Sequence, residues 1–313
     1  MSVLPIVMPI FVLIALGYGA ARAGLLSDTT QRGISEFAFN YAMPALLFRG
    51  IAGAGALAPG SVRIAIAYFG SAGMVWLLAT VVTRVVLRRP AVDAATVAMT
   101  SCFGNVVMIG IPLTLAVVGE AAAAPMAILL ALHSPLMWIT GILHQQSAER
   151  NGGSSGARMI VDLLAELATN PLLIAIAAGV AWRLTGLKMP AMIDSPVALL
   201  AQAGVPCAQV ALGASLTRFA IKGQVPTLGA MLALKLLAFP AITYAMAVMF
   251  GLPRTALEVA VIFASMPAGA NAYLFAQRTQ RVVNSTSGAI ALGTLLGAVT
   301  ATLIIASFGW LLQ

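Results

Sequence analysis

Long apolar stretches separated by short polar connections run through the whole chain. Ten of them come close to the roughly 20 residues that a helix needs to cross the ~30 Å hydrocarbon core of a bilayer. We therefore predict an all-α membrane protein with ten transmembrane helices, at about residues 3–22, 34–54, 62–87, 94–118, 122–144, 160–184, 196–217, 226–250, 255–277 and 284–312.

One connection differs from the others. Residues 144–158, HQQSAERNGGSSGAR, are polar and rich in Gly and Ser, which is typical of a flexible linker. They fall between the fifth and sixth predicted helices. The predicted organisation is a first five-helix repeat at 1–146, a cytoplasmic linker at 147–158 and a second five-helix repeat at 159–313.

Proline and glycine positions recur in the two halves at one spacing, which indicates a duplication. The pairs 162 residues apart are Pro9 with Pro171, Gly17 with Gly179, Gly24 with Gly186, and Pro44 with Pro206. Because five is an odd number of helices, the second copy must enter the membrane from the opposite side. We therefore predict inverted repeats.

The charge content supports lipid as the main solvent. Only 8% of the 313 residues are charged, against 61% hydrophobic, whereas soluble domains carry about a quarter charged residues. The net charge of +8 forms no basic patch, which excludes nucleic acid as a partner. The positive-inside rule places both termini on the periplasmic or extracellular side of the inner membrane.

The sequence lacks the usual signatures of a membrane enzyme. Two cysteines and two histidines are too few for a metal centre of soft ligands, and neither a P-loop nor HExxH occurs. We predict no catalytic residue, no metal and no cofactor. A membrane enzyme stays open as an alternative, and a channel is disfavoured because no charge ring or carbonyl-filter motif occurs.

Two spans contain helix-breaking residues at mid-membrane depth. The fourth reads TSCFGNVVMIGIPL and the ninth reads IFASMPAGANAYLFAQR. The residues concerned are Gly104, Asn105, Gly110 and Pro112 in the fourth span, and Pro267, Gly269 and Asn271 in the ninth. A pair of interrupted spans at corresponding places in two halves is typical of a transporter binding site.

The physical reason is that unwound backbone in hydrocarbon leaves polar groups unpaired unless it lines a cavity or binds a ligand. The N-termini of the resumed helices carry partial positive charge. Such a site favours an anion, to which Asn105 and Asn271 would add amide donors. The alternative is a pair of ordinary kinked helices.

At these motifs the sequence resembles the auxin efflux carrier family, whose bacterial members include malonate transporters and whose plant members include the PIN auxin carriers. The matching segments are FNYAMPALLF (39–48), GNVVMIGIPL (104–113), TNPLLIAIAAG (169–179) and MPAGANAYLFAQ (266–277). The resemblance covers essentially the whole chain. It implies ten helices, crossing broken helices four and nine, transport of organic anions, and movement of one bundle against a scaffold. A homodimer through that scaffold is compatible with it.

By position in the family pattern, Asn105 corresponds to an asparagine that contacts the substrate carboxylate, and Pro112 to the fourth-helix crossover proline. Asn170 corresponds to a second polar position near the substrate. Ala272 and Leu47 depart from the plant pattern, which has proline and serine there. These departures favour a smaller metabolite than auxin.

Lys235 lies in the middle of the eighth span, where an ionisable group is costly and suggests a function. It could attract the anion or stand in the place of a coupling cation. Alternatively, it snorkels or pairs within the scaffold. The coupling ion, a proton or sodium, is left open.

Other polar residues allow a functional and a structural interpretation. His133 could relay protons, but a helix-packing histidine is favoured. Asn40 and Gln202 are candidates for hydrogen bonds to a facing helix near the site. Asp162 and Glu166 could bind a cation, but a solvated helix face is favoured.

The leading hypothesis is a secondary transporter that moves small organic anions, such as malonate-like dicarboxylates, by alternating access. Efflux of aromatic or amphipathic acids such as auxin-like compounds is the alternative. Membrane lipid and the anion are the expected partners.

Overall fold

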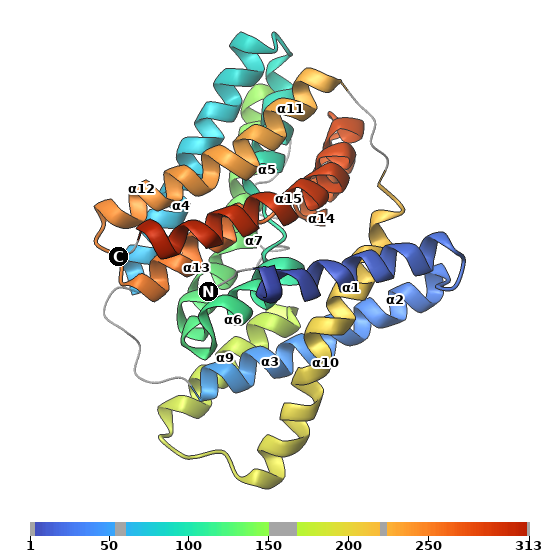
Figure 1. Cartoon of the computed structure of the whole chain (residues 1–313). Coiled ribbons are helices and arrows are strands. Elements are labelled where there is room, and N and C mark those ends of the chain that lie inside the picture. Colours follow the sequence, from blue (N-terminus) through green and yellow to red (C-terminus); the bar gives the residue numbers. More distant parts are fainter. Residues whose placement is uncertain (1–3, 54–60, 150–167, 220–223, 312–313) are drawn as a thin grey trace.

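The computed structural model describes residues 4–53, 61–149, 168–219 and 224–311, and these are almost entirely helical (Figure 1). Most of the predicted linker, and the pair Asp162 and Glu166, lie outside the described residues. The helices are α1 (Leu4–Arg22), α2 (Asp28–Phe37), α3 (Met43–Ala52), α4 (Ser61–Val81), α5 (Ala91–Cys102), α6 (Ile111–Val118), α7 (Ala123–Ala148), α9 (Pro171–Leu184), α10 (Ala191–Leu216), α11 (Val225–Ala233), α12 (Phe239–Met249), α13 (Arg254–Ser265), α14 (Ala270–Thr279) and α15 (Val283–Leu311).

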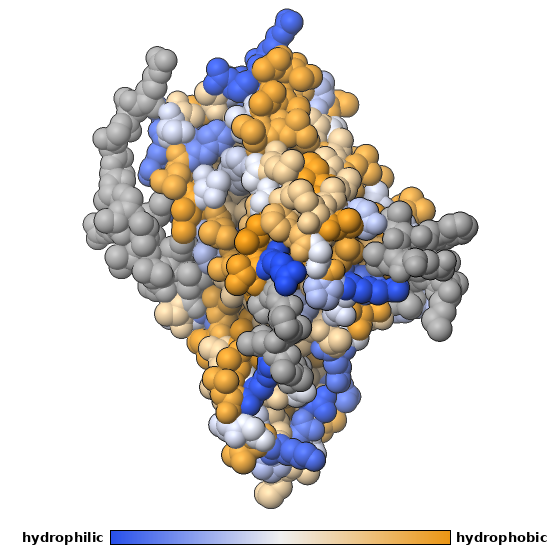
Figure 2. All heavy atoms as spheres, turned by 90° about the vertical axis from the view of Figure 1, so that its left-hand side faces the viewer, coloured by the Kyte–Doolittle hydropathy of each residue, from blue (hydrophilic) through white to orange (hydrophobic). Residues whose placement is uncertain are grey.

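Hydrophobic side chains cover much of the surface, as Figure 2 shows for one face. Within the described residues, five helical segments are long and apolar enough to cross a membrane: Val62–Val86, Glu120–Ala148, Ala191–Leu216, Val225–Met249 and Val283–Phe308. Shorter apolar helices run over Val7–Arg22, Val106–Val118 and Pro171–Leu184. An all-helical, multi-pass protein is therefore confirmed.

Several spans contain a wide π-helical turn. These turns are η1 (Ala38–Ala42), η2 (Val82–Val86), η3 (Val106–Gly110) and η5 (Leu234–Ala238). Three of the four end two residues before a proline, namely Pro44, Pro112 and Pro240. Because proline has no N–H to give to the carbonyl four residues earlier, the turn ahead of it widens. These prolines make the backbone of the spans irregular, which the hydropathy pattern alone does not reveal.

The helices pack in two groups. The α10 bundle consists of α1, α2, α3, α9 and α10, and the crossover bundle of α4 to α7 and α11 to α15. Figure 1 places most of the α10 bundle in the lower part of the view and most of the crossover bundle in the upper part. Contacts between the groups run mainly through α1 with α6, α3 with α7, and α10 with η3.

Glycine allows α1 and α10 to touch along their backbones. A Cβ atom on Gly17 would lie 2.1 Å from the Val210 carbonyl oxygen, and one on Gly213 would lie 1.9 Å from the Ile14 carbonyl oxygen. No side chain fits at these distances. The α10 bundle therefore depends on glycine at this contact between α1 and α10.

Replacing Gly17 by Ala should destabilise the protein by about 1–3 kcal/mol or more, because the added methyl meets backbone that cannot rotate away. Thermal unfolding of the purified protein in detergent measures the loss. Gly19→Ala is the matched control, since Gly19 lies in the same helix with nothing within 4 Å of an added Cβ. Equal melting temperatures for the two variants would contradict the close packing.

Candidate functional site

Both helices that the sequence predicts to be broken are interrupted. On the first, α5 ends at Cys102 and helix resumes at Val106. On the second, α13 ends at Ser265 and α14 begins at Ala270. Each gap therefore falls in the Gly/Pro/Asn segment that carried the prediction.

The two gaps cross and hold each other through backbone hydrogen bonds. The Asn105 N–H donates to the Pro267 carbonyl at 2.7 Å, and the Gly269 N–H donates to the Phe103 carbonyl at 3.0 Å. The residues between them form a single antiparallel bridge. Unwound backbone that would be costly in lipid is thus partly satisfied by the opposite gap. We call these residues, 103–105 and 267–269, the crossing.

Small residues keep the crossing tight. A Cβ on Gly269 would lie 3.2 Å from the Gly104 carbonyl oxygen. On the far side, Pro267 packs against Gly293 and Gly297 of α15. The polar ends of two helices are therefore held at one buried point between α5, α13 and α15.

Two asparagines stand where the helices resume. The Asn105 side chain is 9% exposed, and its Oδ1 accepts a hydrogen bond from the Met108 N–H at 3.2 Å, so it caps the resumed helix. Among the described residues, its amide nitrogen donates to no partner. Asn271 is half-buried in the first turn of α14, with no hydrogen bond to another described side chain. Both amide groups can therefore donate to a bound anion.

Pro112, predicted to be the crossover proline, is not among the residues that form the crossing. It is the second residue of α6, beyond the π-helical turn η3. Because Pro112 has no N–H, the Met108 carbonyl loses its usual donor, and the Gln209 amide of α10 donates to it instead. Gln209 is fully buried, and its Oε1 has no partner in the described part of the chain.

Three other predicted polar residues make no described hydrogen bond to the crossing. Asn170 caps its own helix, accepting from the Leu172 N–H at 2.9 Å, and its described hydrogen bonds stay within α9. Asn40 in η1 and Gln202 in α10 are exposed. Their expected hydrogen bonds to a facing helix are absent among the described contacts.

Lys235 and His133 lie close behind the crossing. Lys235, in η5, is 2% exposed, and its Nζ donates to the Ala264 carbonyl at 2.8 Å. The Lys235 ammonium is therefore buried and does not snorkel. His133 packs against the Phe103 ring with centroids 4.6 Å apart, and its Nδ1 lies 3.4 Å from the Tyr68 hydroxyl.

A cavity of about 1160 Å³ opens between the two bundles, walled by α3, α6, α7 and the segment joining α9 to α10. Its charged lining is more basic than acidic and consists of Arg49, Arg183, Lys188, Glu120 and Asp194. Arg49 and Asp194 form an ion pair at 2.7 Å. The crossing residues are not part of the wall.

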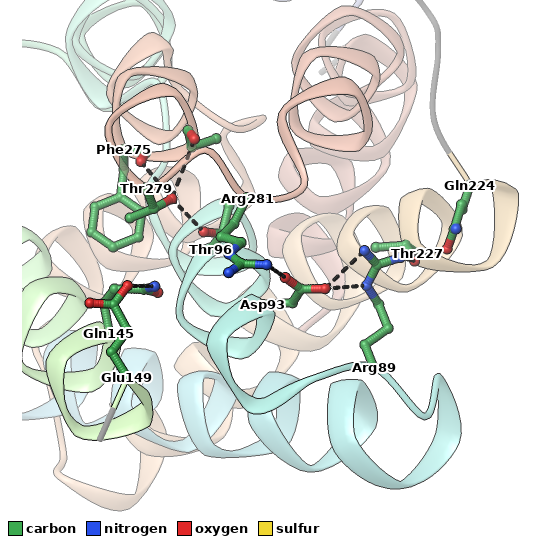
Figure 3. Close-up of polar contacts among 11 residues, drawn as sticks. Arg89, Asp93, Thr96, Gln145, Glu149, Gln224, Thr227, Phe275, Thr279 and Arg281 are labelled. Carbon is green, nitrogen blue, oxygen red and sulfur yellow. Dashed lines mark hydrogen bonds and ion pairs between the residues drawn. The ribbon is translucent and has the colours of Figure 1, made fainter. Parts of the chain in front are cut away.

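Sequence reasoning missed a buried ion-pair cluster on the crossover bundle (Figure 3). Asp93, in the first turn of α5, lies 2.9 Å from Arg89 and 3.9 Å from Arg281. Arg89 also donates to Gln224 and to Thr227, 3.4 Å away on α11. The cluster thus joins α5 to α11 and to the α14–α15 junction. The four-residue spacing of Arg89 and Asp93 was its only sequence signal.

Comparison with known proteins identifies the family. Residues 2–305 match the family model described as "Membrane transport protein". The chain is 25% identical over 300 residues to a "Putative malonate transporter" of Rhizobium meliloti (strain 1021), covering 95% of this chain and 93% of that protein. It is also 29% identical over 148 residues to a "Probable auxin efflux carrier component 1b" of Oryza sativa subsp. japonica, covering 44% of this chain and 26% of the rice protein.

The family match extends over both bundles and the crossing, and the relatives are named as transporters. The resemblance to auxin efflux carriers, taken from the motifs, is therefore confirmed. The chain belongs to the membrane transport protein family that includes the auxin efflux carriers, and it is a membrane transporter and not an enzyme.

Proposed function

We propose that the protein is a secondary carrier for small carboxylates, which bind at the crossing. The observation that carries the proposal is the pair of hydrogen bonds joining Asn105 to Pro267 and Gly269 to Phe103. They hold two helix N-termini, each with an asparagine, at one point. The helix N-termini carry partial positive charge, the asparagines supply amide donors, and no described acidic side chain is buried beside them. Such a site suits a carboxylate.

We further propose ten membrane-spanning segments in two inverted repeats, 1–146 and 159–313. The described helices contribute to each of the ten predicted spans. The second, fourth, eighth and ninth spans are divided by a π turn or a gap. Contacts support the symmetry. Gly17 approaches the Val210 carbonyl, and Gly179 approaches the Phe48 carbonyl. Gly179 and Val210 are the counterparts of Gly17 and Phe48 at the spacing of 162 residues. The contact of Gly17 with Val210 and the contact of Gly179 with Phe48 are therefore equivalent in the two repeats.

Two contacts join equivalent or nearly equivalent positions of the two repeats. Gly204 packs against Ala42, again 162 positions apart. The bridge at the crossing joins Gly104 to Ala268, at a spacing of 164. Contacts between equivalent positions are expected along the axis that relates two inverted halves.

Transport would follow from the crossover bundle moving against the α10 bundle, so that the crossing faces each side in turn. The cavity between the bundles supports this proposal, because it leaves space for movement between α3 of one bundle and α7 of the other. Two ion pairs support the predicted grouping of the loops on two faces, and we propose that both termini lie outside the inner membrane. Arg49 and Asp194 share one predicted face, and Arg218 and Asp28 share the other.

A malonate-like dicarboxylate is the favoured substrate, because the relative matched over nearly its whole length is named for malonate. An auxin-like aromatic acid is the second candidate, since the rice relative is named for auxin. That match covers under half of this chain.

The test is counterflow in proteoliposomes containing the purified protein. Vesicles loaded with unlabelled malonate should take up labelled malonate faster than empty vesicles and should saturate with concentration. Indole-3-acetate, acetate and succinate loaded in parallel rank the substrates. Linear, unsaturable uptake would point to a channel, and no uptake of any of these acids would refute the proposed function.

A further inference from the structure

Lys235 places a charged side chain beside the crossing. Its Nζ lies 3.3 Å from the position that a Cβ on Gly104 would occupy. It donates to the Ala264 carbonyl at 2.8 Å and lies 4.5 Å from the centroid of the Phe239 ring. An ammonium group has three donors, and only one described acceptor is in place. The group is therefore deeply buried and incompletely compensated.

No described carboxylate faces Lys235. The titratable side chains around it are Tyr68 of α4, Cys102 of α5 and His133 of α7. His133 Nε2 is buried and has no described partner. Helices α11, α12 and α15 carry no Asp, Glu, Lys or Arg, and the charged residues of α4, α5 and α13 lie toward the helix ends.

A buried ammonium without a counter-charge is costly, and so is a lone carboxylate. A carboxylate seated at the crossing would lie just across Gly104 from Lys235. Each group would then stabilise the charged form of the other, and this coupling is reciprocal. Binding of the anion would promote protonation of Lys235, and protonation would tighten anion binding.

We propose that Lys235 carries the coupling proton, so that the protein moves a carboxylate together with a proton. This inference rests on the proposed carboxylate site. When the crossing opens to one side, the Lys235 amine takes a proton from hydronium and leaves water. When the anion departs on the other side, the ammonium returns the proton to water. No bond other than N–H forms or breaks.

The energetic reason for coupling is charge balance. An empty site with a neutral amine carries no net charge, and in a loaded site the ammonium neutralises one of the two carboxylates of malonate. An anion alone or an ammonium alone would take an uncompensated charge through the low-dielectric interior. The 2% exposure of Lys235 keeps its proton from exchanging with water in this conformation, as coupling requires.

The test uses the full chain in sodium-free proteoliposomes with a pH dye inside and the membrane potential clamped. Adding external malonate should acidify the interior. An imposed gradient of one pH unit, acid outside, should drive about tenfold accumulation if one proton moves with each malonate. Malonate counterflow at equal pH is measured on the same vesicles.

Lys235→Met removes the counter-charge of the bound anion, so it should slow counterflow at equal pH and abolish both interior acidification and the response to the gradient. Lys235→Arg keeps the positive charge and should retain counterflow at equal pH, but it should also lose acidification and the response to the gradient, because guanidinium does not release its proton. Arg84→Met is the control, since Arg84 is an exposed cation in η2 that does not line the cavity, and it should keep full coupling. Wild-type acidification tests the inference even if a variant fails to fold.

Wild-type counterflow without interior acidification would overturn the coupling inference and leave the carrier proposal standing. Acidification that persists in Lys235→Met or Lys235→Arg would exclude Lys235 as the proton carrier. If wild type exchanges neither malonate nor the other acids, the proposed function and this inference fail together.

Discussion

Replacing Asn105 by Asp should lower carboxylate affinity by about a hundredfold while the protein stays folded. The aspartate keeps the oxygen that accepts from the Met108 N–H, and carboxylates are good helix caps. A bound carboxylate within about 5 Å of the new charge would be repelled by about 3 kcal/mol at an effective dielectric of about 20. Malonate binding to the detergent-purified protein, followed by thermal shift or calorimetry, measures the loss.

Two further variants separate charge from position. Asn105→Ser keeps a capping oxygen without adding charge, so it should weaken binding by much less than Asn105→Asp. Asn40→Asp adds the same charge at an exposed position in η1 and should leave affinity within about twofold. If Asn105→Asp binds malonate as well as wild type, the anion does not sit at the crossing.

The crossing could be predicted because its signals are local. Glycine and proline disfavour continuous helix, and the pattern occurs once in each half of the chain. The sequence therefore located both gaps, and the repeat implied that they correspond. It did not locate the strand-like contact within the segment. Pro112 was taken for part of the crossing, yet its effect is to widen η3 and to free the Met108 carbonyl.

The partners of the site could not be predicted, because they come from segments far apart in the chain. Gln209 supplies the donor that Met108 lacks from 101 positions away, and nothing local in α10 distinguishes it. The same holds for the Ala264 carbonyl that receives Lys235. A proline in a buried helix predicts that another group must donate a hydrogen bond to the freed carbonyl, but tertiary packing determines which group does so.

Asn170, Asn40 and Gln202 stay predictions, because their described contacts do not include the crossing. Each was placed near the site by family position or by the repeat, but polarity in a span has other uses. Asn170 satisfies the first turn of α9, as an N-cap does. Asn40 and Gln202 are exposed on the described chain, so burial separates them from Asn105.

Replacing Asp93 by Asn should destabilise the crossover bundle by about 2–3 kcal/mol. The Asp93 side chain is 6% exposed and neutralises Arg89, which is 20% exposed. Removing one partner of a buried pair leaves the other charge uncompensated, at a cost of about 3–5 kcal/mol. The cost expected here is lower, because Arg281, the second partner of Asp93, is 45% exposed and water can solvate its charge. Thermal unfolding in detergent measures the change, and transport should fall with it because α5 leads directly into the crossing.

Asp28→Asn is the matched control, because its pair with Arg218 is 78% and 46% exposed and should contribute at most about 1 kcal/mol. A double-mutant cycle of Asp93→Asn with Arg89→Gln isolates the interaction. The double variant should be more stable than the sum of the single losses predicts, because Arg89 is then no longer a buried charge without a partner. Additive losses would mean that Asp93 stabilises α5 without pairing to Arg89, and the cluster in Figure 3 would not act as a unit.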